Sequence, residues 1–481
     1  MACGMPSNPR SGPRSWSLLF PLLFLPVLAV EAGPLPQSSL SPASWLAQAA
    51  AQGELAIPEE VQGWFDSAKE AYNRGDGQEA LRLQQQVVAW VQVHLPGGHR
   101  FRARALGNLG FFLGGMGRYD EALAPTQETV KIYRELAKVD TIYQGDLAQS
   151  LTNLSVNYSE LERHQDALAT TEEAVAMVRE LAKLNPTYRD NLAKLLVYLG
   201  VDYANLKRHE QALPPTMEAI RIRRNPTNPS PEQLADLADS LTRLGWYLRH
   251  LKRYEEALGP TVEAVQLFQR LARTDPAFRQ DLGDTLISLS EGYTDLERHE
   301  EALATSEEAV KIFRDLARID SDYQDRLARV LGYLGVDYFN LGRAEAGLPH
   351  QREAVKIYRS LAKLDPLYLG NLAGSLSKLG MSYGKLERLQ EALVSTTEAV
   401  KILRELTKTE PGYLEELARV LDHLSDLQLH SGQSQEAQAS LEELVSVLRS
   451  LAARDPSKRE DLEQKIRRLE EFIHEKSTLS A

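Results

Sequence analysis

Two related stretches decide the fold: LSVNYSELERHQDAL at residues 154–168 and LSEGYTDLERHEEAL at residues 289–303. Each ends in a relative of the tripeptide Glu-Ala-Leu. Such tripeptides recur every 45 residues, beginning at Glu121, Asp166, Gln211, Glu256, Glu301, Ala346, Glu391 and Glu436, with an earlier copy 42 residues upstream at Glu79. A fixed period of about 20–50 residues is typical of solenoids and other arrays. We therefore predict one array over residues 58–481, rather than the three domains that the length alone suggests.

Each repeat is predicted to contain two helices. Apolar residues such as Leu192, Leu195, Leu199 and Tyr203 recur at helical spacing, and the second half of each repeat behaves in the same way. The expected helices have about 16–19 residues each, or about 25–28 Å. Dipeptides such as Asn185-Pro186 mark the boundaries, because Asn, Asp or Ser caps a helix and proline suits its first position. No part of the array alternates like a strand.

Small residues occupy one position in eight successive repeats, each preceded by leucine. They are Gly110, Ser155, Gly200, Gly245, Ser290, Gly335, Gly380 and Ser425. Glycine inside a helix costs about 1 kcal/mol relative to alanine. We therefore expect the two helices of each repeat to cross closely at this position.

These residues resemble the tetratricopeptide repeat (TPR). The resemblance rests on Leu199-Gly200, Tyr203, Ala212 and Ala219, and again on Leu334-Gly335, Tyr338 and Ala354, although Gly347 replaces the usual alanine there. The usual repeat of the family has about 34 residues. The longer repeats of this chain are similar to the kinesin-light-chain-type and bacterial arrays. The resemblance implies an all-α fold, a TPR-like right-handed α-solenoid superhelix of about nine helix pairs, used for protein binding.

The resemblance also implies that the first helix of each repeat lines a concave groove. The candidate groove residues are Phe111, Val156, Val197, Val201, Trp246, Arg249, Ile287, Arg329, Val336, Phe339, Asn340 and Met381. Trp246 is the best candidate for an anchor, because aromatic residues dominate interface energetics. The alternative is that these side chains pack between neighbouring helices. The family's clamp for a C-terminal carboxylate is not supported, because its Asn is missing from the position after the small residue.

Two segments depart from the repeat. Three prolines in residues 223–231 predict an early helix end and a longer loop, or a hinge that divides the array. The charged segment 461–476 predicts a capping helix with a solvated outer face, which repeat arrays need.

The N-terminal segment has the pattern of a signal peptide. Arg10 and Arg14 precede a 14-residue apolar stretch, residues 17–30, and cleavage after Ala32 is expected. The chain would then be exported, periplasmic or secreted. The alternatives are a membrane anchor formed by residues 17–30, an organelle transit peptide or a cytoplasmic chain. Residues 33–57, rich in Pro, Ser and Ala, are expected to form a linker.

The amino-acid composition excludes several classes of function. With 55 Lys and Arg against 67 Asp and Glu, the net charge of −12 argues against nucleic-acid binding. One cysteine, Cys3, excludes an internal disulfide or a cysteine-built metal site. No catalytic constellation, metal site or cofactor is expected, nor a membrane span in the mature chain. We predict an exported scaffold that binds a peptide or helix of a partner protein. The alternative is a self-associating structural repeat protein.

Overall fold

The structure, a computed structural model, describes residues 57–454 and 459–480. The predicted signal peptide, the linker up to residue 56 and the dipeptide Asp455-Pro456 lie outside these residues. The chain divides into two compact units at the bond between Leu251 and Lys252. We call residues 57–251 the N-terminal unit and residues 252–480 the C-terminal unit, and describe each by itself.

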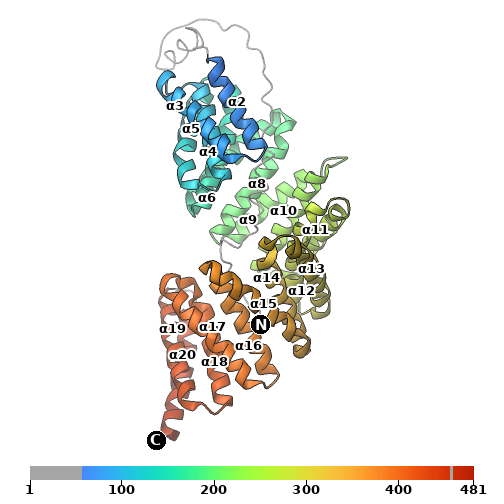
Figure 1. Cartoon of the computed structure of the whole chain (residues 1–481), viewed down its shortest axis with the longest axis vertical. Coiled ribbons are helices and arrows are strands. Elements are labelled where there is room, and N and C mark those ends of the chain that lie inside the picture. The colour runs from blue at the N-terminus through green and yellow to red at the C-terminus, as the bar shows by residue number, and fades with distance from the viewer. Residues whose placement is uncertain (1–56, 455–458, 481) are drawn as a thin grey trace. The chain divides into compact units, whose positions relative to one another are not determined.

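Both units are built from α-helices, and the described ranges contain no strand (Figure 1). The first helices of the repeats, the A helices, are α2 (Glu59–Asn73), α4 (Arg100–Gly115), α6 (Gln144–Glu160), α8 (Arg189–Asn205), α10 (Pro231–His250), α12 (Arg279–Asp295), α14 (Gln324–Asn340), α16 (Leu369–Lys385) and α18 (Leu414–His430). The second helices, the B helices, are α3 (Gly77–His94), α5 (Tyr119–Val139), α7 (His164–Leu184), α9 (His209–Arg223), α11 (Tyr254–Thr274), α13 (His299–Ile319), α15 (Ala344–Leu364), α17 (Leu389–Thr409) and α19 (Ser434–Arg454). Most B helices have 21 residues, more than the sequence pattern predicts.

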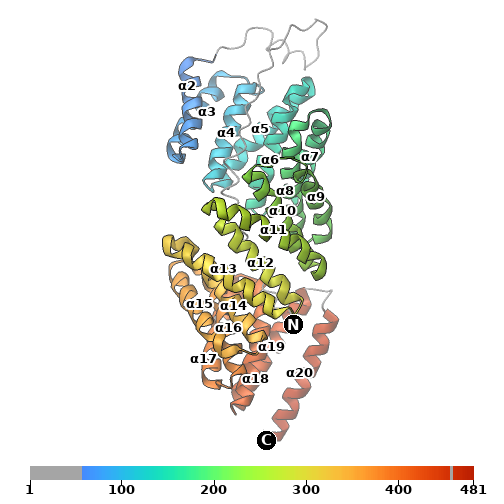
Figure 2. The same ribbon diagram turned by 90° about the vertical axis from the view of Figure 1, so that its right-hand side faces the viewer.

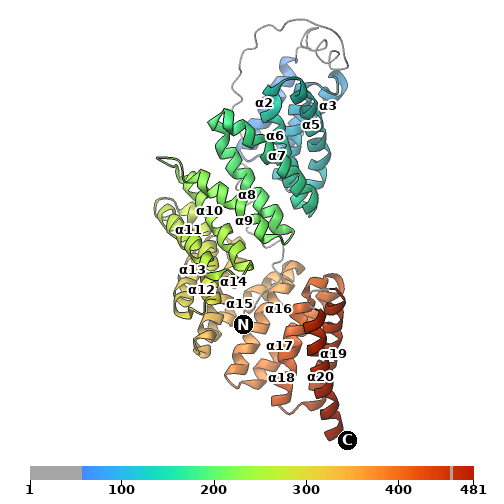
Figure 3. The same ribbon diagram turned by 180° about the vertical axis from the view of Figure 1, so that it is seen from behind.

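Within each unit, each helix packs against the one before it, so A and B helices alternate along the unit (Figure 3). The final helix α20 (Arg459–Ser480) lies alongside α19 (Figure 2). Ile466 is buried there, whereas the neighbouring charged residues are exposed. The segment predicted to cap the array is thus a helix that packs on α19.

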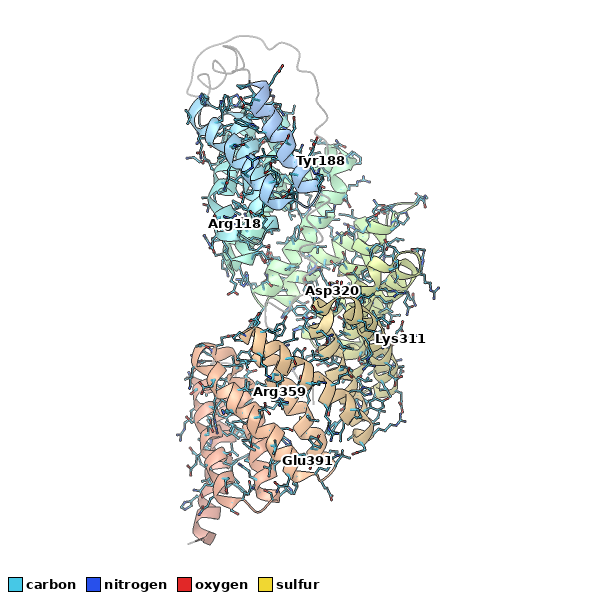
Figure 4. All side chains as sticks on the ribbon, in the orientation of Figure 1. Arg118, Tyr188, Lys311, Asp320, Arg359 and Glu391 are labelled. Carbon is cyan, nitrogen blue, oxygen red and sulfur yellow. The ribbon has the colours of Figure 1, made fainter. Side chains whose placement is uncertain are left out.

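The boundary residues cap helices as predicted, with one difference. At most boundaries the cap begins a single 3-10 turn, after which the A helix starts; these turns are η4 (Thr141–Tyr143), η5 (Pro186–Tyr188), η6 (Pro276–Phe278), η7 (Ser321–Tyr323), η8 (Pro366–Tyr368) and η9 (Pro411–Tyr413). The Asn185 side chain accepts the amide of Thr187 at 3.0 Å, and Asp320, labelled in Figure 4, accepts that of Asp322 at 2.9 Å. By contrast, α10 starts directly at its proline, with a capping box between Ser230 and Gln233.

The predicted close crossing of A and B helices is confirmed at Gly200 and Gly335. A Cβ atom on Gly200 would lie 2.5 Å from Thr216 Oγ1, and one on Gly335 would lie 2.2 Å from Gln351 Cγ. Both distances are far below van der Waals contact. The turn that follows the crossing also repeats, and its left-handed residue is Lys207 (φ 60°) in one repeat and Gly342 (φ 70°) in another.

An ionic ladder joins successive B helices on their outer surface. An arginine of one B helix pairs with a glutamate of the next, as in Arg134–Glu173, Arg179–Glu218, Arg314–Glu353, Arg359–Glu398 and Arg404–Glu443. Their N–O distances are 2.5–2.9 Å. Arg359 is labelled in Figure 4. These side chains are partly exposed to solvent, so each pair contributes at most about 1 kcal/mol.

Two buried aspartates join successive repeats inside the array. In the N-terminal unit, Asp202 of α8 accepts a hydrogen bond from Thr171 of α7 at 2.6 Å. In the C-terminal unit, Asp337 of α14 accepts hydrogen bonds from Ser306, Thr294 and Ser290 at 2.6, 3.2 and 3.4 Å. Burial raises the pKa of Asp202 to about 7 and that of Asp337 to about 6.

The proline-rich segment ends α9 early, at Arg223, and a loop leads to α10. This confirms the predicted early stop. The hypothesis that this segment divides the array is wrong, because the boundary between the two compact units follows Leu251, beyond α10. The reason is that Arg223 joins α9 to α10 within the N-terminal unit, through hydrogen bonds described below.

Candidate functional site

A cavity of about 80 Å³ lies in the N-terminal unit, on the side of the unit that its A helices form. We call this side of either unit its A-helix face. Three successive A helices, α6, α8 and α10, supply most of its lining, and α7 and α9 complete it. Tyr188, labelled in Figure 4, lies at the end of η5 and also lines it. The cavity is the candidate functional site because side chains from several repeats converge there.

The apolar part of the lining comes from repeat-core positions. Val178 of α7 and Leu195, Val197 and Val201 of α8 are buried and line the cavity. Two of the predicted groove residues, Val197 and Val201, are therefore part of this site. An apolar wall of this kind can accommodate the aliphatic part of a ligand.

One core position in the cavity lining is polar. Arg223 occupies a position that holds a buried apolar or aromatic residue in other B helices, including Tyr133, Phe268, Phe313, Tyr358 and Leu403. Its guanidinium donates to the backbone oxygen of Asp236 at 2.6 Å and to the Ser240 hydroxyl, and it lies 3.6 Å from the Asp236 carboxylate. The side chain thus lies across the end of α9 and contacts α10.

Two further ion pairs border the cavity. Arg243 donates to Asp239 at 2.8 Å within α10, and Lys194 lies 3.1 Å from Asp190 within α8. Burial opposes the charge on Arg243, but Asp239 beside it raises the pKa of the guanidinium. Burial also raises the pKa of Tyr198, which lines the cavity between these pairs. The wall is therefore a set of partly desolvated charges, whose interactions are stronger than at an open surface.

Sequence reasoning missed the charged residues of the site. Arg223, Asp236, Asp239 and Arg243 were not among the groove candidates. A signal was present, because Arg223 interrupts a position that is otherwise apolar or aromatic. The cavity could not be foreseen, since it depends on how side chains from several helices pack.

The other groove candidates are dispersed over both units. Phe111 and Ile287 are buried, as the packing alternative expects, and Phe111 lies 5.2 Å from the ring of Tyr72. Asn340 is exposed, whereas Val156, Trp246, Arg249, Arg329, Val336, Phe339 and Met381 are half-buried.

Trp246 already has aromatic partners in its own unit. Its ring lies 3.7 Å from that of His250 and 5.4 Å from that of His209, measured between centroids. Trp246 is not part of the cavity lining. Its role as an anchor stays a prediction.

Arg329 belongs to a charged cluster in the C-terminal unit. Asp284 of α12 accepts Arg329 at 2.8 Å and Arg326 at 3.3 Å, both from α14. Lys378 of α16 lies 4.8 Å from the ring centre of Tyr333. Arg326 also lies 3.6 Å from Asp325 of its own helix, so the cluster contains both basic and acidic groups.

Two further features concern the whole described chain. Across residues 57–454 and 459–480, no cluster of three or more His, Cys, Asp or Glu side chains is arranged to hold a metal ion. None of the helices within those ranges is both long and apolar enough to cross a bilayer.

Comparison with known families settles the nature of the repeat. Residues 102–142, 237–273 and 327–366 match the tetratricopeptide repeat family. The chain is a tetratricopeptide-repeat protein with long repeats. Residues 138–185 and 266–321 also match the family described as anaphase-promoting complex subunit 5. No curated protein matches the sequence significantly.

Solved structures agree with this fold. The apo form of RapI is 12% identical, with a TM-score of 0.58 over 81% of this chain and 98% of that one. The apo quorum sensor NprR from B. thuringiensis is 13% identical, with a TM-score of 0.54 over 81% of this chain and 99% of that one. BtubC (BKLC) from P. vanneervenii is 21% identical, with a TM-score of 0.42 over 50% of this TPR chain and 92% of that one. At these identities the likeness concerns the fold alone.

Proposed function

We propose that this TPR protein is a protein-interaction scaffold that binds a peptide or helical segment of a partner on its A-helix face. The observation that supports this best is the cavity lined by α6, α8 and α10 in the N-terminal unit. Side chains from three repeats converge on one small volume with both apolar and charged walls. Such a mixture is typical of sites that bury an apolar group and fix its orientation through a few polar contacts.

Site-specific photocrosslinking tests this proposal. A photoreactive amino acid is placed at Gln149, which lines the cavity, and in a matched variant at Ala176, which is exposed on α7. In the native cell, the proposal expects a discrete adduct from position 149 that is absent from position 176. Equal adducts from both positions would contradict binding at the cavity. An adduct with twice the mass of the chain would support the self-associating alternative.

A cavity-filling variant shows whether the cavity itself is needed. The C-terminal unit has Tyr358 and Asn371 where the N-terminal unit, three repeats earlier, has Arg223 and Asp236. The double substitution Arg223→Tyr with Asp236→Asn therefore installs a pair that this fold already accommodates and leaves no buried charge unpaired. The adduct from position 149 should disappear in this variant, while its circular dichroism and melting curve should be retained. Persistence of the adduct in a folded variant would contradict the proposal.

We also propose that the chain is exported through residues 1–32. The supporting observation is the basic, apolar and small-residue pattern around Arg14, residues 17–30 and Ala32. The test is the N-terminal sequence and the location of the full-length product. Recovery outside the cytoplasm with a new N-terminus at Gly33 is the expected result, and an intact N-terminus in the cytoplasm would overturn it.

A further inference from the structure

Two histidines from successive helices lie close together in the N-terminal unit. His209 is the first residue of α9 and His250 is the last residue of α10. Their ring centroids are 4.8 Å apart. His209 is half-buried and His250 is exposed, so solvent reaches both side chains. Neither residue lines the cavity, so the pair is a separate feature of this unit.

The separation of the two rings suits a shared metal ion. With a Zn–N bond of about 2.1 Å and a ring centre about 1.1 Å behind the nitrogen, each centroid lies about 3.2 Å from the ion. Two such rings, at ligand–metal–ligand angles of about 90–110°, have centroids about 4.5–5.2 Å apart. The observed 4.8 Å lies within this range.

A backbone contact sets the ring of His250 for this role. Its Nδ1 atom lies 2.9 Å from the carbonyl oxygen of Trp246. A carbonyl only accepts, so Nδ1 carries the proton and the lone pair of the neutral ring is on Nε2. Histidines that bind metals typically donate their other ring N–H to a carbonyl or carboxylate, because this bond fixes the tautomer and the ring orientation.

Other repeats with the same turn histidine lack the second imidazole. His164 and His299 occupy the position of His209 in their own repeats, and Asn205 and Asn340 occupy the position of His250. The pair is therefore a departure from the repeat pattern. The two asparagines also show that the array accommodates an amide at the position of His250.

We propose that His209 and His250 chelate a divalent transition-metal ion of the Zn²⁺ class, with water completing its coordination. Imidazole suits Zn²⁺, Ni²⁺ and Cu²⁺, whereas Ca²⁺ and Mg²⁺ take oxygen ligands. The described residues offer no third His, Cys, Asp or Glu ligand there, so the site has open coordination positions. This inference goes beyond the proposed function and does not depend on it.

Calorimetric titration with Zn²⁺ alone tests the inference. The full chain, prepared without a histidine tag, should bind one ion saturably. His250→Asn installs the residue that the array already has at Asn205 and Asn340. This variant should bind Zn²⁺ at least about tenfold more weakly, because the second imidazole of a chelate binds intramolecularly. Its circular dichroism should be unchanged.

The matched controls use the unpaired counterparts of His209. His209→Tyr, which copies Tyr254 of the next repeat, should weaken binding as His250→Asn does. His164→Tyr and His299→Tyr make the same change in the other repeats and should leave Zn²⁺ affinity unchanged. Equal affinities for the unmodified chain and folded His250→Asn would overturn the inference. Equal losses in all three tyrosine variants would also overturn it, because they would indicate diffuse binding.

Trp246 gives a second readout, because its ring centroid lies 3.7 Å from that of His250 and 5.4 Å from that of His209. Bound Cu²⁺ should quench its fluorescence, and Trp246→Phe should remove this quenching while both histidines remain. Cu²⁺ should bind more tightly than Zn²⁺, and Mg²⁺ should not compete. Quenching that persists in His250→Asn, or competition by Mg²⁺, would contradict an imidazole site.

Discussion

The A-helix faces of α6, α8 and α10 and of α12, α14 and α16 are related by a shift of three repeats, yet their charges are arranged differently. In the first face the carboxylates Asp236 and Asp239 lie on the third helix. In the second face Asn371 and Gly374 replace them. There Asp284 on the first helix pairs with two arginines of the middle helix.

The difference shows which part of a repeat can change. The crossing glycines Gly200 and Gly335 and the buried Asp202 and Asp337 are shared by the two faces. The charged residues around them differ between the two faces. A repeat array can therefore keep its core and present a different electrostatic surface in each block.

The largest difference in stability between variants of the two faces should be seen when the Asp284 carboxylate is removed. Asp284→Ala leaves Arg329 without its carboxylate partner and leaves Arg326 with only Asp325, at 3.6 Å, and we expect a loss of about 3 kcal/mol in stability, because a partly buried cation remains unpaired. Hydrogen exchange should locate the loss in α12 and α14. Gln149→Ala, at the equivalent position of the first face, should change stability by less than about 0.5 kcal/mol. Similar losses in both variants would contradict this account.

The loss of stability on filling the helix crossing should differ less between the two faces. Gly200→Leu should destabilise by about 2–3 kcal/mol through overpacking, since Thr216 is β-branched and its hydroxyl donates to Ala212 at 2.8 Å. Gly335→Leu should cost less, because the longer Gln351 side chain can adopt other rotamers and its amide has no hydrogen-bond partner. Thermal melting of the two variants compares them directly. An unchanged melting curve for Gly200→Leu would refute the close crossing.

The buried aspartates predict a pH dependence. In the folded chain the pKa of Asp202 is raised to about 7, whereas an unfolded aspartate titrates near about 3.9. The stability associated with this group is therefore fully present below about pH 4 and is lost as pH rises through about 7. Asp202→Asn should raise stability by about 2 kcal/mol at pH 8 and change it little at pH 4.

Asp337→Asn provides the comparison for that experiment. Asp337 has three hydroxyl donors and a pKa of about 6, so its substitution should give a smaller gain at pH 8. Denaturant unfolding at pH 4, 6 and 8 measures both variants. A gain that is independent of pH would show that ionisation of Asp202 is not the cause.

The smallest expected effect on stability concerns the turns between the A and B helices. Lys207 adopts a left-handed conformation that Gly342, its counterpart three repeats later, adopts without steric cost. Lys207→Gly should raise stability by about 0.5 kcal/mol, and Gly342→Lys should lower it by a similar amount. Melting temperatures of the two variants should therefore shift in opposite directions. Shifts of the same sign would contradict the conformational explanation.

The fold was predictable from the sequence because its signals recur. The period, the leucine before each small residue and the capping residues each appear many times, so the helix pairs and the crossings could be placed from the sequence alone. The 3-10 turns were not predicted, since Asn185-Pro186 fits the start of either kind of helix. The division after Leu251 was not predicted either, because the sequence there keeps the repeat pattern.

The candidate site was predicted only in part. Val197 and Val201 were found because they follow the repeat, and they line the cavity. Arg223 departs from the repeat pattern, and Asp239 lies at a position that varies between repeats, so periodicity alone selects neither residue. The cavity depends on how side chains of α6, α8, α9 and α10 pack, which periodicity does not predict.

The arginine–glutamate ladder on the B helices has a consequence for how such a chain changes in length. Arg134–Glu173 and Arg404–Glu443 have the same chemistry, so this contact does not distinguish one neighbour from another. A recombination event that deletes or duplicates one whole repeat would rejoin the ladder without a mismatch. The buried aspartates do distinguish neighbours, since Asp202 needs Thr171 and Asp337 needs Ser306. Viable deletions and duplications should therefore keep each aspartate with the hydroxyl of the repeat before it.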